Sequence, residues 1–180
     1  MAWNKARLKI SDAEYKARCD HLRRQLGDAT GVVLFDADYI KYYTGFAFIP
    51  TERPIVFAMN TAGERALFVP RLEVEHAQSN ANIDLVGHYK EYPGEIHPMM
   101  GLATMLADMN IKMTIAADED SYPWIFGYRG PALSTVTKAT VQLIRPLIEA
   151  QMAIKSPAEI ELIRESSKWA NLAHQLLPDY

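Results

Sequence analysis

The sequence predicts an α/β fold, a mixed β-sheet with helices on both faces, and three observations support it. Residues 31–35 form a continuous apolar run, which is typical of a strand buried on both faces. Residues 54–59 and 65–69 are separated by turn-forming residues at 60–63, so they form an antiparallel hairpin. Beyond this hairpin, helical and strand patterns alternate, which favours strands joined by covering helices. With 180 residues, of which 49% are hydrophobic, the chain is long enough for one substantial core.

Composition excludes several classes of partner and location. The net charge is −3, from 19 Lys+Arg and 22 Asp+Glu, with no basic stretch, so we expect no nucleic acid partner. The longest uncharged run is well short of the about 20 residues that a membrane span needs, so we expect no membrane partner either. The single cysteine, Cys19, cannot form an internal disulfide, and charged residues begin at Lys5, which excludes a signal-peptide core. We therefore expect a cytoplasmic protein.

The first helix has clear local signals. Ser11 and Glu14 have the spacing of a capping box, in which each side chain bonds to the other residue's backbone N–H. Apolar side chains then recur at helical spacing on one face: Tyr15, Cys19, Leu22 and Leu26. Gly27 is expected to end this helix. Because Cys19 lies on this apolar face, we expect a buried structural thiol.

The remaining elements follow the same two periodicities. Helices are expected at residues 39–43, 72–77, 99–109, 121–126 and 144–150, and further strands at residues 83–86, 112–116 and 141–143. Asp118, Glu119 and Asp120 lie just before one of these helices, where negative charge suits the helix dipole, so we expect solvated carboxylates rather than a metal site. The five histidines are scattered without metal-ligand spacing, and no motif for a nucleophile or a phosphate loop is present. The sequence therefore predicts no catalytic residue and no metal in this chain.

The last helix has two possible explanations. Ser156, Pro157 and Glu159 mark its start, with a second capping box and a proline in the first turn, and the helix extends to about Leu177. Its apolar residues spread over more than one stripe, which predicts burial on several sides. Either the helix docks on its own domain, or its partner lies beyond Tyr180.

The segment with most functional promise is the aromatic-rich stretch at residues 42–54. It lies between predicted elements, and Arg53 comes directly before a strand. Exposed aromatic residues with arginine are typical of recognition surfaces, and a guanidinium is suited to bidentate binding of a carboxylate. The alternative is an aromatic minicore in which Arg53 pairs with a nearby acid such as Glu52.

Three separated segments of the chain resemble sequence elements of one known family. Residues 38–46 (DYIKYYTGF) are similar to its N-I-x-Y-L-T-G-F element, and residues 67–77 (LFVPRLEVEHA) to its strand-to-helix V-P-R-x-E-x-E-H-A element. Residues 152–164 (MAIKSPAEIELIR) resemble R-x-I-K-S-P-x-E-I-x-x-I-R, the entry to its catalytic domain, with Met152 where arginine is common. The family is that of creatinase, prolidase (Xaa-Pro dipeptidase) and aminopeptidase P. The chain resembles the N-terminal domain of this family plus the linker helix, most closely that of an Xaa-Pro dipeptidase.

This resemblance implies a ribonuclease H-like α/β domain at residues 1–151, followed at residues 152–180 by a linker and the first helix of a truncated catalytic domain. It implies a full-length parent that is an Xaa-Pro dipeptidase-like metallopeptidase, whose two divalent metal ions and their ligands lie after Tyr180. The 180-residue chain alone would be an inactive, non-catalytic N-terminal domain without a cofactor. The last helix would pack on the missing domain.

The resemblance also implies roles for individual residues. Arg53 falls where creatinase-like members place an arginine that binds the substrate carboxylate. Further candidates for the same substrate rim are Phe46, Phe48 and Thr51. Arg71 and His76, in contrast, are interpreted as hairpin-to-helix structure. We expect a homodimer that, in the full-length enzyme, acts on a dipeptide or small amide. The alternatives are the N-terminal domain of a creatinase-like or other small amide or amidine hydrolase, and a stand-alone interaction module.

Overall fold

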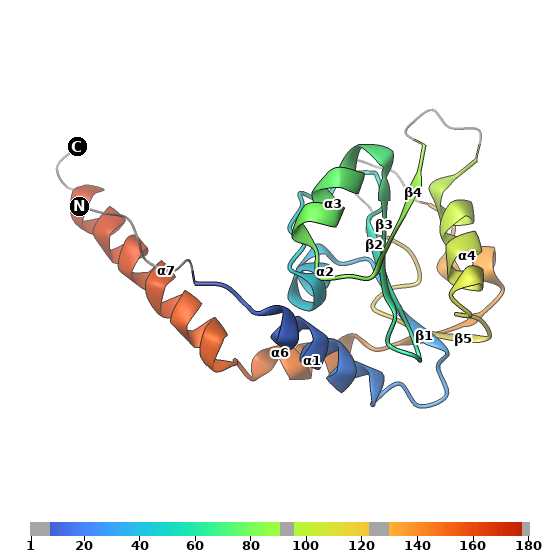
Figure 1. Cartoon of the computed structure of the whole chain (residues 1–180), viewed down its shortest axis with the longest axis horizontal. Coiled ribbons are helices and arrows are strands. Elements are labelled where there is room, and N and C mark those ends of the chain that lie inside the picture. Colours follow the sequence, from blue (N-terminus) through green and yellow to red (C-terminus); the bar gives the residue numbers. More distant parts are fainter. Residues whose placement is uncertain (1–7, 91–95, 123–129, 178–180) are drawn as a thin grey trace.

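The computed structural model describes residues 8–90, 96–122 and 130–177, which include a six-stranded β-sheet (Figure 1). The strands are β1 (Gly31–Leu34), β2 (Val56–Asn60), β3 (Arg65–Pro70), β4 (Leu85–Tyr89), β5 (Thr114–Ala117) and β6 (Thr140–Leu143). Their order across the sheet is β4-β3-β2-β1-β5-β6. The pairs β1–β2 and β2–β3 are antiparallel, and the pairs β3–β4, β1–β5 and β5–β6 are parallel. The predicted mixed sheet is confirmed.

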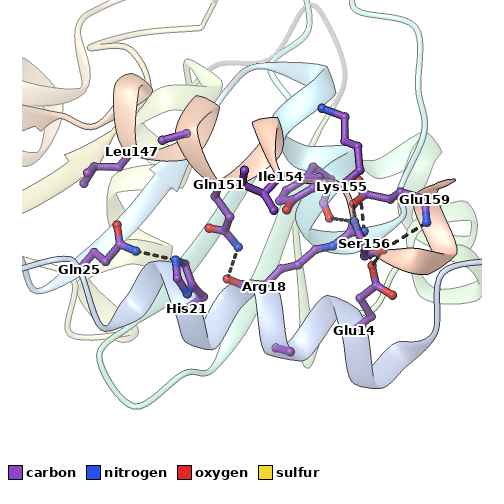
Figure 2. Close-up of a pocket in the computed structure, with 13 residues that line it drawn as sticks. Glu14, Arg18, His21, Gln25, Leu147, Gln151, Ile154, Lys155, Ser156 and Glu159 are labelled. Carbon is purple, nitrogen blue, oxygen red and sulfur yellow. Dashed lines mark hydrogen bonds and ion pairs between the residues drawn. The ribbon is translucent and has the colours of Figure 1, made fainter.

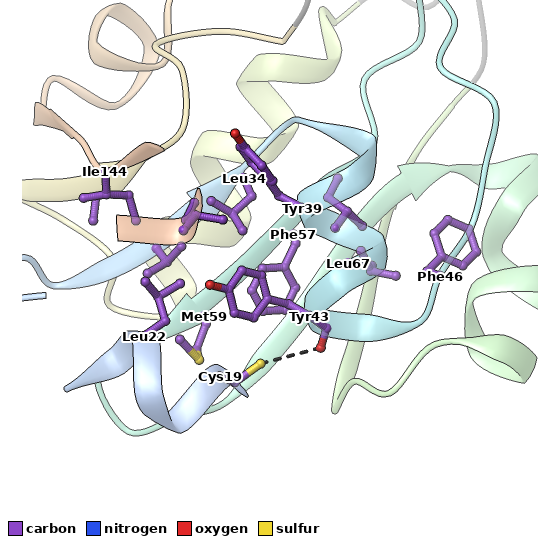
Figure 3. Close-up of a cluster of buried hydrophobic side chains, with 14 of the residues drawn as sticks. Cys19, Leu22, Leu34, Tyr39, Tyr43, Phe46, Phe57, Met59, Leu67 and Ile144 are labelled. Carbon is purple, nitrogen blue, oxygen red and sulfur yellow. Dashed lines mark hydrogen bonds between the residues drawn. The ribbon is translucent and has the colours of Figure 1, made fainter. Parts of the chain in front are cut away.

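Helices cover both faces of this sheet, as predicted. They are α1 (Asp12–Arg23), α2 (Ala37–Thr44), the 3-10 helix η1 (Arg71–Glu73), α3 (Val74–Asn80), α4 (Pro98–Asp108), α5 (Leu133–Thr137), α6 (Arg145–Ala153) and α7 (Pro157–Leu176). On β1, Val32 and Leu34 belong to one core, and Val33 belongs to the other, because side chains alternate along a strand. Helices α1, α2, α3 and α6 complete the first core (Figure 3), and α4 and α5 complete the second. All of β1 is buried, which explains its continuous apolar sequence.

One helix, α5, is not predicted by the sequence, and most of another expected helix lies outside the described residues, whereas the other predicted elements are present within a few residues. Residues 123–129, which hold most of the helix expected at 121–126, lie outside the described residues, and Ser121 is not helical. The sequence does not predict α5, because its five residues are mostly β-branched or hydroxylated. A tertiary contact supports this helix: the Asp120 carboxylate accepts hydrogen bonds from the Ser134 backbone N–H at 2.8 Å and from its hydroxyl at 2.6 Å.

Asp118 corrects the prediction that the carboxylates at 118–120 are solvated. Asp118 is 1% exposed, and its two oxygens accept hydrogen bonds from the backbone N–H groups of Phe35, Asp36 and Glu119 at 2.7–3.1 Å. The carboxylate therefore links the end of β1 to the end of β5 and satisfies buried backbone donors. Burial raises the pKa of Asp118 to about 6, although these three donors favour the ionised form.

The start of α1 also differs from its prediction, a reciprocal capping box. Ser11 does cap the helix, since its hydroxyl accepts a hydrogen bond from the Glu14 backbone N–H at 3.2 Å. The Glu14 carboxylate, however, turns to Arg18 and Ser156 instead of Ser11. Cys19 is confirmed as a structural residue: it is 2% exposed, and burial raises the pKa of its thiol to about 12, which keeps the thiol protonated.

The last helix, α7, projects away from the sheet (Figure 1), and none of its residues is buried. It begins as predicted, with a capping box between Ser156 and Glu159. Large apolar side chains remain exposed on it and on its C-cap: Ile160, Ile163, Trp169, Leu172, Leu176 and Leu177. Of the two explanations that the sequence allows, docking of α7 along its own domain is therefore not seen in the described part of the chain. Among the described helices, none is long and apolar enough to cross a membrane.

Replacing Asp118 with asparagine tests whether burial raises the pKa of this carboxylate. Because its folded-state pKa of about 6 lies above the about 3.9 of an unfolded chain, the folded protein holds the proton more tightly. The resulting stabilisation is fully present below about pH 4 and is lost as the pH rises through about 6. Relative to Asp118→Asn, we expect the free energy of unfolding of the native chain to fall by roughly 2–3 kcal/mol between about pH 4 and about pH 7. Urea unfolding measures this, and a pH-independent difference between the two proteins would contradict it.

Candidate functional site

The aromatic-rich segment and the start of α3 together form a pocket of about 380 Å³. Residues 47–55 supply one wall, and the junction of β3, η1 and α3 supplies the other. Three of the four residues predicted for the substrate rim line it, together with a carboxylate and an imidazole: Phe48, Thr51, Arg53, Glu73 and His76. The family-like segment at 67–77 contributes lining residues, and the segment at 38–46 ends directly before the other wall; we call this cavity the Arg53 pocket.

Gly45, at the end of α2, directs the chain into the Arg53 pocket. Its φ of 75° is left-handed, and a Cβ at this position would lie 2.8 Å from the Tyr15 hydroxyl. Both the backbone conformation and the available space therefore require glycine. On the opposite wall, β3 ends at Pro70 and the chain continues directly into η1 and α3.

Phe46 supports the pocket from the core side. It is fully buried, whereas Phe48 and Thr51 line the cavity. The Phe46 ring centroid lies 5.6 Å from that of Phe48 and 4.8 Å from that of the His76 imidazole. Ring contacts at these distances restrain both neighbours. Phe46 therefore holds two of the rings that line the pocket.

Arg53 lines the pocket beside Glu52. Its Nε lies 3.7 Å from the Glu52 carboxylate, and the two side chains are 37% and 48% exposed. The Thr51 hydroxyl accepts a hydrogen bond from the Arg53 backbone N–H at 3.3 Å, which stabilises the local turn. An exposed ion pair of this kind contributes only about 0–1 kcal/mol, so a ligand carboxylate can compete for the guanidinium. The pairing with Glu52 and a role in ligand binding are therefore compatible.

His76 is a pocket residue that the sequence pattern assigns to structure alone. Its Nδ1 lies 2.9 Å from the Glu73 carboxylate, and its ring contacts Phe46. Glu73 and His76 are three residues apart at the start of α3, a spacing that places both on one helix face. This spacing, within the family-like segment at 67–77, is the signal that indicates them. Arg71 of the same segment is exposed on η1 and is not among the residues that line the pocket.

A second cavity, of about 530 Å³, lies where α1, α6 and the start of α7 meet (Figure 2). Its central charged group is Arg18, which is 7% exposed. The guanidinium donates to the Glu14 carboxylate at 2.5 Å and to the Tyr42 carbonyl at 2.8 Å, and it lies 3.4 Å from the Glu159 carboxylate. It also lies over the Tyr42 ring, 4.1 Å from the centroid, in a cation–π contact.

These contacts join α7 to the domain. The Ser156 hydroxyl donates to Glu14 at 2.7 Å, and the Gln151 amide donates to the Arg18 carbonyl at 3.1 Å. Because an uncompensated buried charge is costly, the guanidinium and the two carboxylates hold one another in place. The groups bind each other, as expected for a structural joint, and we call the set of Glu14, Arg18, Ser156 and Glu159 the Arg18 joint.

Charged side chains also gather near the ends of β1 and β5, around a cavity of about 470 Å³. Arg145 donates to the Glu119 carboxylate at 2.7 Å and to the Tyr39 hydroxyl at 3.0 Å, and it lies 3.9 Å from the Asp36 carboxylate. The acids at this edge are thus matched by a cation. Within the described ranges, no group of three or more His, Cys, Asp or Glu side chains could hold a metal ion.

The fold defines the class of protein: an α/β domain with a mixed six-stranded sheet, helices on both faces and a projecting C-terminal helix. The sequence profile of the creatinase/prolidase N-terminal domain matches residues 18–129, more than half of the chain. The chain therefore belongs to the creatinase/prolidase N-terminal domain family, as its three family-like segments predict. No curated protein sequence matches the chain.

Solved structures of similar fold include both longer and shorter proteins. An Xaa-Pro dipeptidase from Bacillus anthracis has a TM-score of 0.71 at 16% identity, and the match covers 94% of this chain and 44% of that one. A proline dipeptidase from Streptococcus pneumoniae TIGR4 has a TM-score of 0.59 at 27% identity, over 79% of this chain and 98% of that one. The creatinase/prolidase N-terminal domain of an X-Pro dipeptidase from Streptococcus pyogenes has a TM-score of 0.58 at 25% identity, over 78% of this chain and 99% of that one. This chain thus spans less than half the length of the Bacillus protein.

Replacing Arg18 with methionine tests the Arg18 joint. The substitution leaves the Glu14 and Glu159 carboxylates, which are 22% and 19% exposed, without their shared cation. We expect the free energy of unfolding to fall by about 2–4 kcal/mol. We also expect a broader distribution of distances between spin labels on α4 and on the middle of α7, measured by pulsed electron resonance.

Arg164→Met is the matched control, because among the described residues Arg164 on α7 forms an exposed ion pair with Glu161 at 2.6 Å. It should change the stability by less than about 0.5 kcal/mol and leave the distance distribution unchanged. Equal effects of the two substitutions would show that the Arg18 joint does not position α7.

Proposed function

We propose that this chain is the N-terminal domain of an Xaa-Pro dipeptidase-like hydrolase, in which it completes the substrate rim and supports a homodimer. The observation that carries the proposal is the family membership shown by residues 18–129. Similar folds occur both within a full-length Xaa-Pro dipeptidase, over 44% of its chain, and as the isolated N-terminal domain of an X-Pro dipeptidase. The proposed role is therefore that of one domain of a larger enzyme.

In this proposal, hydrolysis takes place in a second domain that follows α7. Two divalent metal ions held there would activate water and polarise the scissile carbonyl. The exposed apolar side chains of α7 support this arrangement, because a helix with apolar residues on several sides needs a partner. The Arg18 joint would then set the direction in which α7 enters that partner.

The contribution of this chain to substrate binding would come from the Arg53 pocket. A dipeptide has a free carboxylate, and a guanidinium binds such a group through two parallel hydrogen bonds. Thr51 adds a hydroxyl to the lining of this pocket, and Phe48 adds an apolar surface. The pocket would therefore select ligands that combine a carboxylate with an apolar ring or side chain, as an Xaa-Pro dipeptide does.

Replacing Arg53 with alanine in the full-length enzyme tests the substrate role. Loss of a charge-assisted contact of about 1.5–3 kcal/mol should raise KM for a dipeptide about 10- to 100-fold. The KM of Arg53→Lys should lie between the values of the native enzyme and of Arg53→Ala, because lysine keeps the charge but lacks the planar guanidinium. Steady-state kinetics measures these values, and unchanged KM and kcat in Arg53→Ala would reject the role.

Arg71→Ala provides the matched control, since Arg71 is an exposed arginine close to the pocket that does not line it. Its KM should stay within about twofold of the native value. The 180-residue chain by itself should show no dipeptidase activity with or without added divalent metal. A metal-dependent rate from this chain alone would contradict its assignment as a non-catalytic domain.

A further inference from the structure

Strand β4 forms one open edge of the sheet. Its only strand neighbour is β3 among the described residues, so alternate backbone N–H and C=O groups of β4 point away from the sheet. Its sequence, Leu-Val-Gly-His-Tyr, contains no Lys, Glu or Pro, the residues with which monomeric proteins commonly protect such edges. Leu85, at its start, is 45% exposed. The edge therefore has the properties of a strand that accepts another strand.

The residues on and around β4 are self-complementary about Gly87. If two copies of β4 pair antiparallel with Gly87 opposite Gly87, Leu85 lies opposite the partner's Tyr89. The same register places Asp84, just before β4, opposite the partner's Lys90, just after it. Asp84 is half exposed while it binds Arg65 at 3.0 Å, so its carboxylate is accessible to a second cation. Both ends of the pairing thus match an acid with a base.

The packing of β4 also suits this pairing. The Tyr89 ring is held 5.3 Å from the Phe68 ring, and its hydroxyl donates to the Pro54 carbonyl at 3.0 Å. Tyr89 therefore presents a fixed surface to an incoming Leu85. Gly87 leaves no side chain at the centre, where Met105 and Phe68 already fill the space that a Cβ would occupy.

The opposite edge of the sheet, β6, lacks this complementarity. It is flanked by Lys138 and Arg145, so antiparallel pairing of two β6 strands brings cations together at both ends. Lys138 has a left-handed φ of 59°, which ends the extended conformation before the strand. Of the two edges, β4 is the one whose sequence fits a second copy.

We propose that two copies of this chain associate through antiparallel pairing of β4 about Gly87, which joins two six-stranded sheets into one. This inference deepens the proposed homodimer and names its surface; it does not depend on the Arg53 pocket. A five-residue pairing buries less surface than a standard stable interface, so the expected dissociation constant for the 180-residue chain is on the order of 0.1 mM. A C2 axis perpendicular to the sheet, midway between the two Gly87 residues, relates the two copies.

Sedimentation of the 180-residue chain at increasing concentration tests this proposal, together with amide hydrogen exchange. We expect the average mass to rise toward that of a dimer, and alternate amides of β4 to become protected as the concentration rises. The amides of β6 should not change, which makes this strand the internal control. A chain that remains monomeric at about ten times the expected dissociation constant would overturn the proposal.

Two substitutions separate β4 pairing from other modes of association. Lys90→Glu puts an acid opposite Asp84 at both ends, and Leu85→Glu adds a charge on the edge strand; each should weaken the dimer about tenfold or more. Lys138→Gln removes a charge beside β6 without giving that edge an acid opposite Arg145, and it should leave the dissociation constant unchanged. Circular dichroism checks that all three variants fold.

A dimer whose affinity is the same in Lys90→Glu and Leu85→Glu would overturn the β4 assignment. Protection that appears on α7 instead of β4 would do the same. Either result would still be compatible with the proposed homodimer, because the copies would then associate through another surface. The outcome for β4 is thus separable from the outcome for the proposed function.

Discussion

The buried contact between Arg18 and the carboxylates of Glu14 and Glu159 determines how the two parts of this chain meet. One guanidinium binds α1, the end of α2 and the first turn of α7, and it is almost completely shielded from water. A charge in such a position must stay paired, because separating it from its partners costs several kcal/mol. The orientation of α7 relative to the sheet therefore depends on one cation shared between elements that are far apart in the sequence.

Local patterns predicted the elements of the fold, and long-range contacts explain what those patterns missed. The buried strand at 31–35 and the antiparallel hairpin were predictable because their signals lie within a few neighbouring residues. The Glu14 carboxylate, in contrast, binds Ser156, 142 positions away. Asp118 accepts from a backbone N–H 83 positions away, so its burial could not be inferred from its acidic neighbours. Spacing within one helix carries no information about partners from another element.

The candidate site divides in the same way. Phe48, Thr51 and Arg53 come from one segment, and their clustering was predictable from composition and from the family resemblance. His76 and Glu73 come from the other side of the hairpin, so only the pairing of β2 with β3 and the turn into α3 bring them to the same pocket. The wall built by one segment was thus visible in the sequence, whereas the fold was needed to show that Glu73 and His76 face it.

Amide hydrogen exchange on α7 tests most directly whether this helix packs against a second domain in the longer protein. The comparison is between the 180-residue chain and the longer protein that the proposed function requires. The account predicts fast exchange at residues 160–176 in the short chain and at least about tenfold slower exchange in the longer protein, with α4 unchanged in both. Equal exchange of α7 in the two proteins would contradict the account.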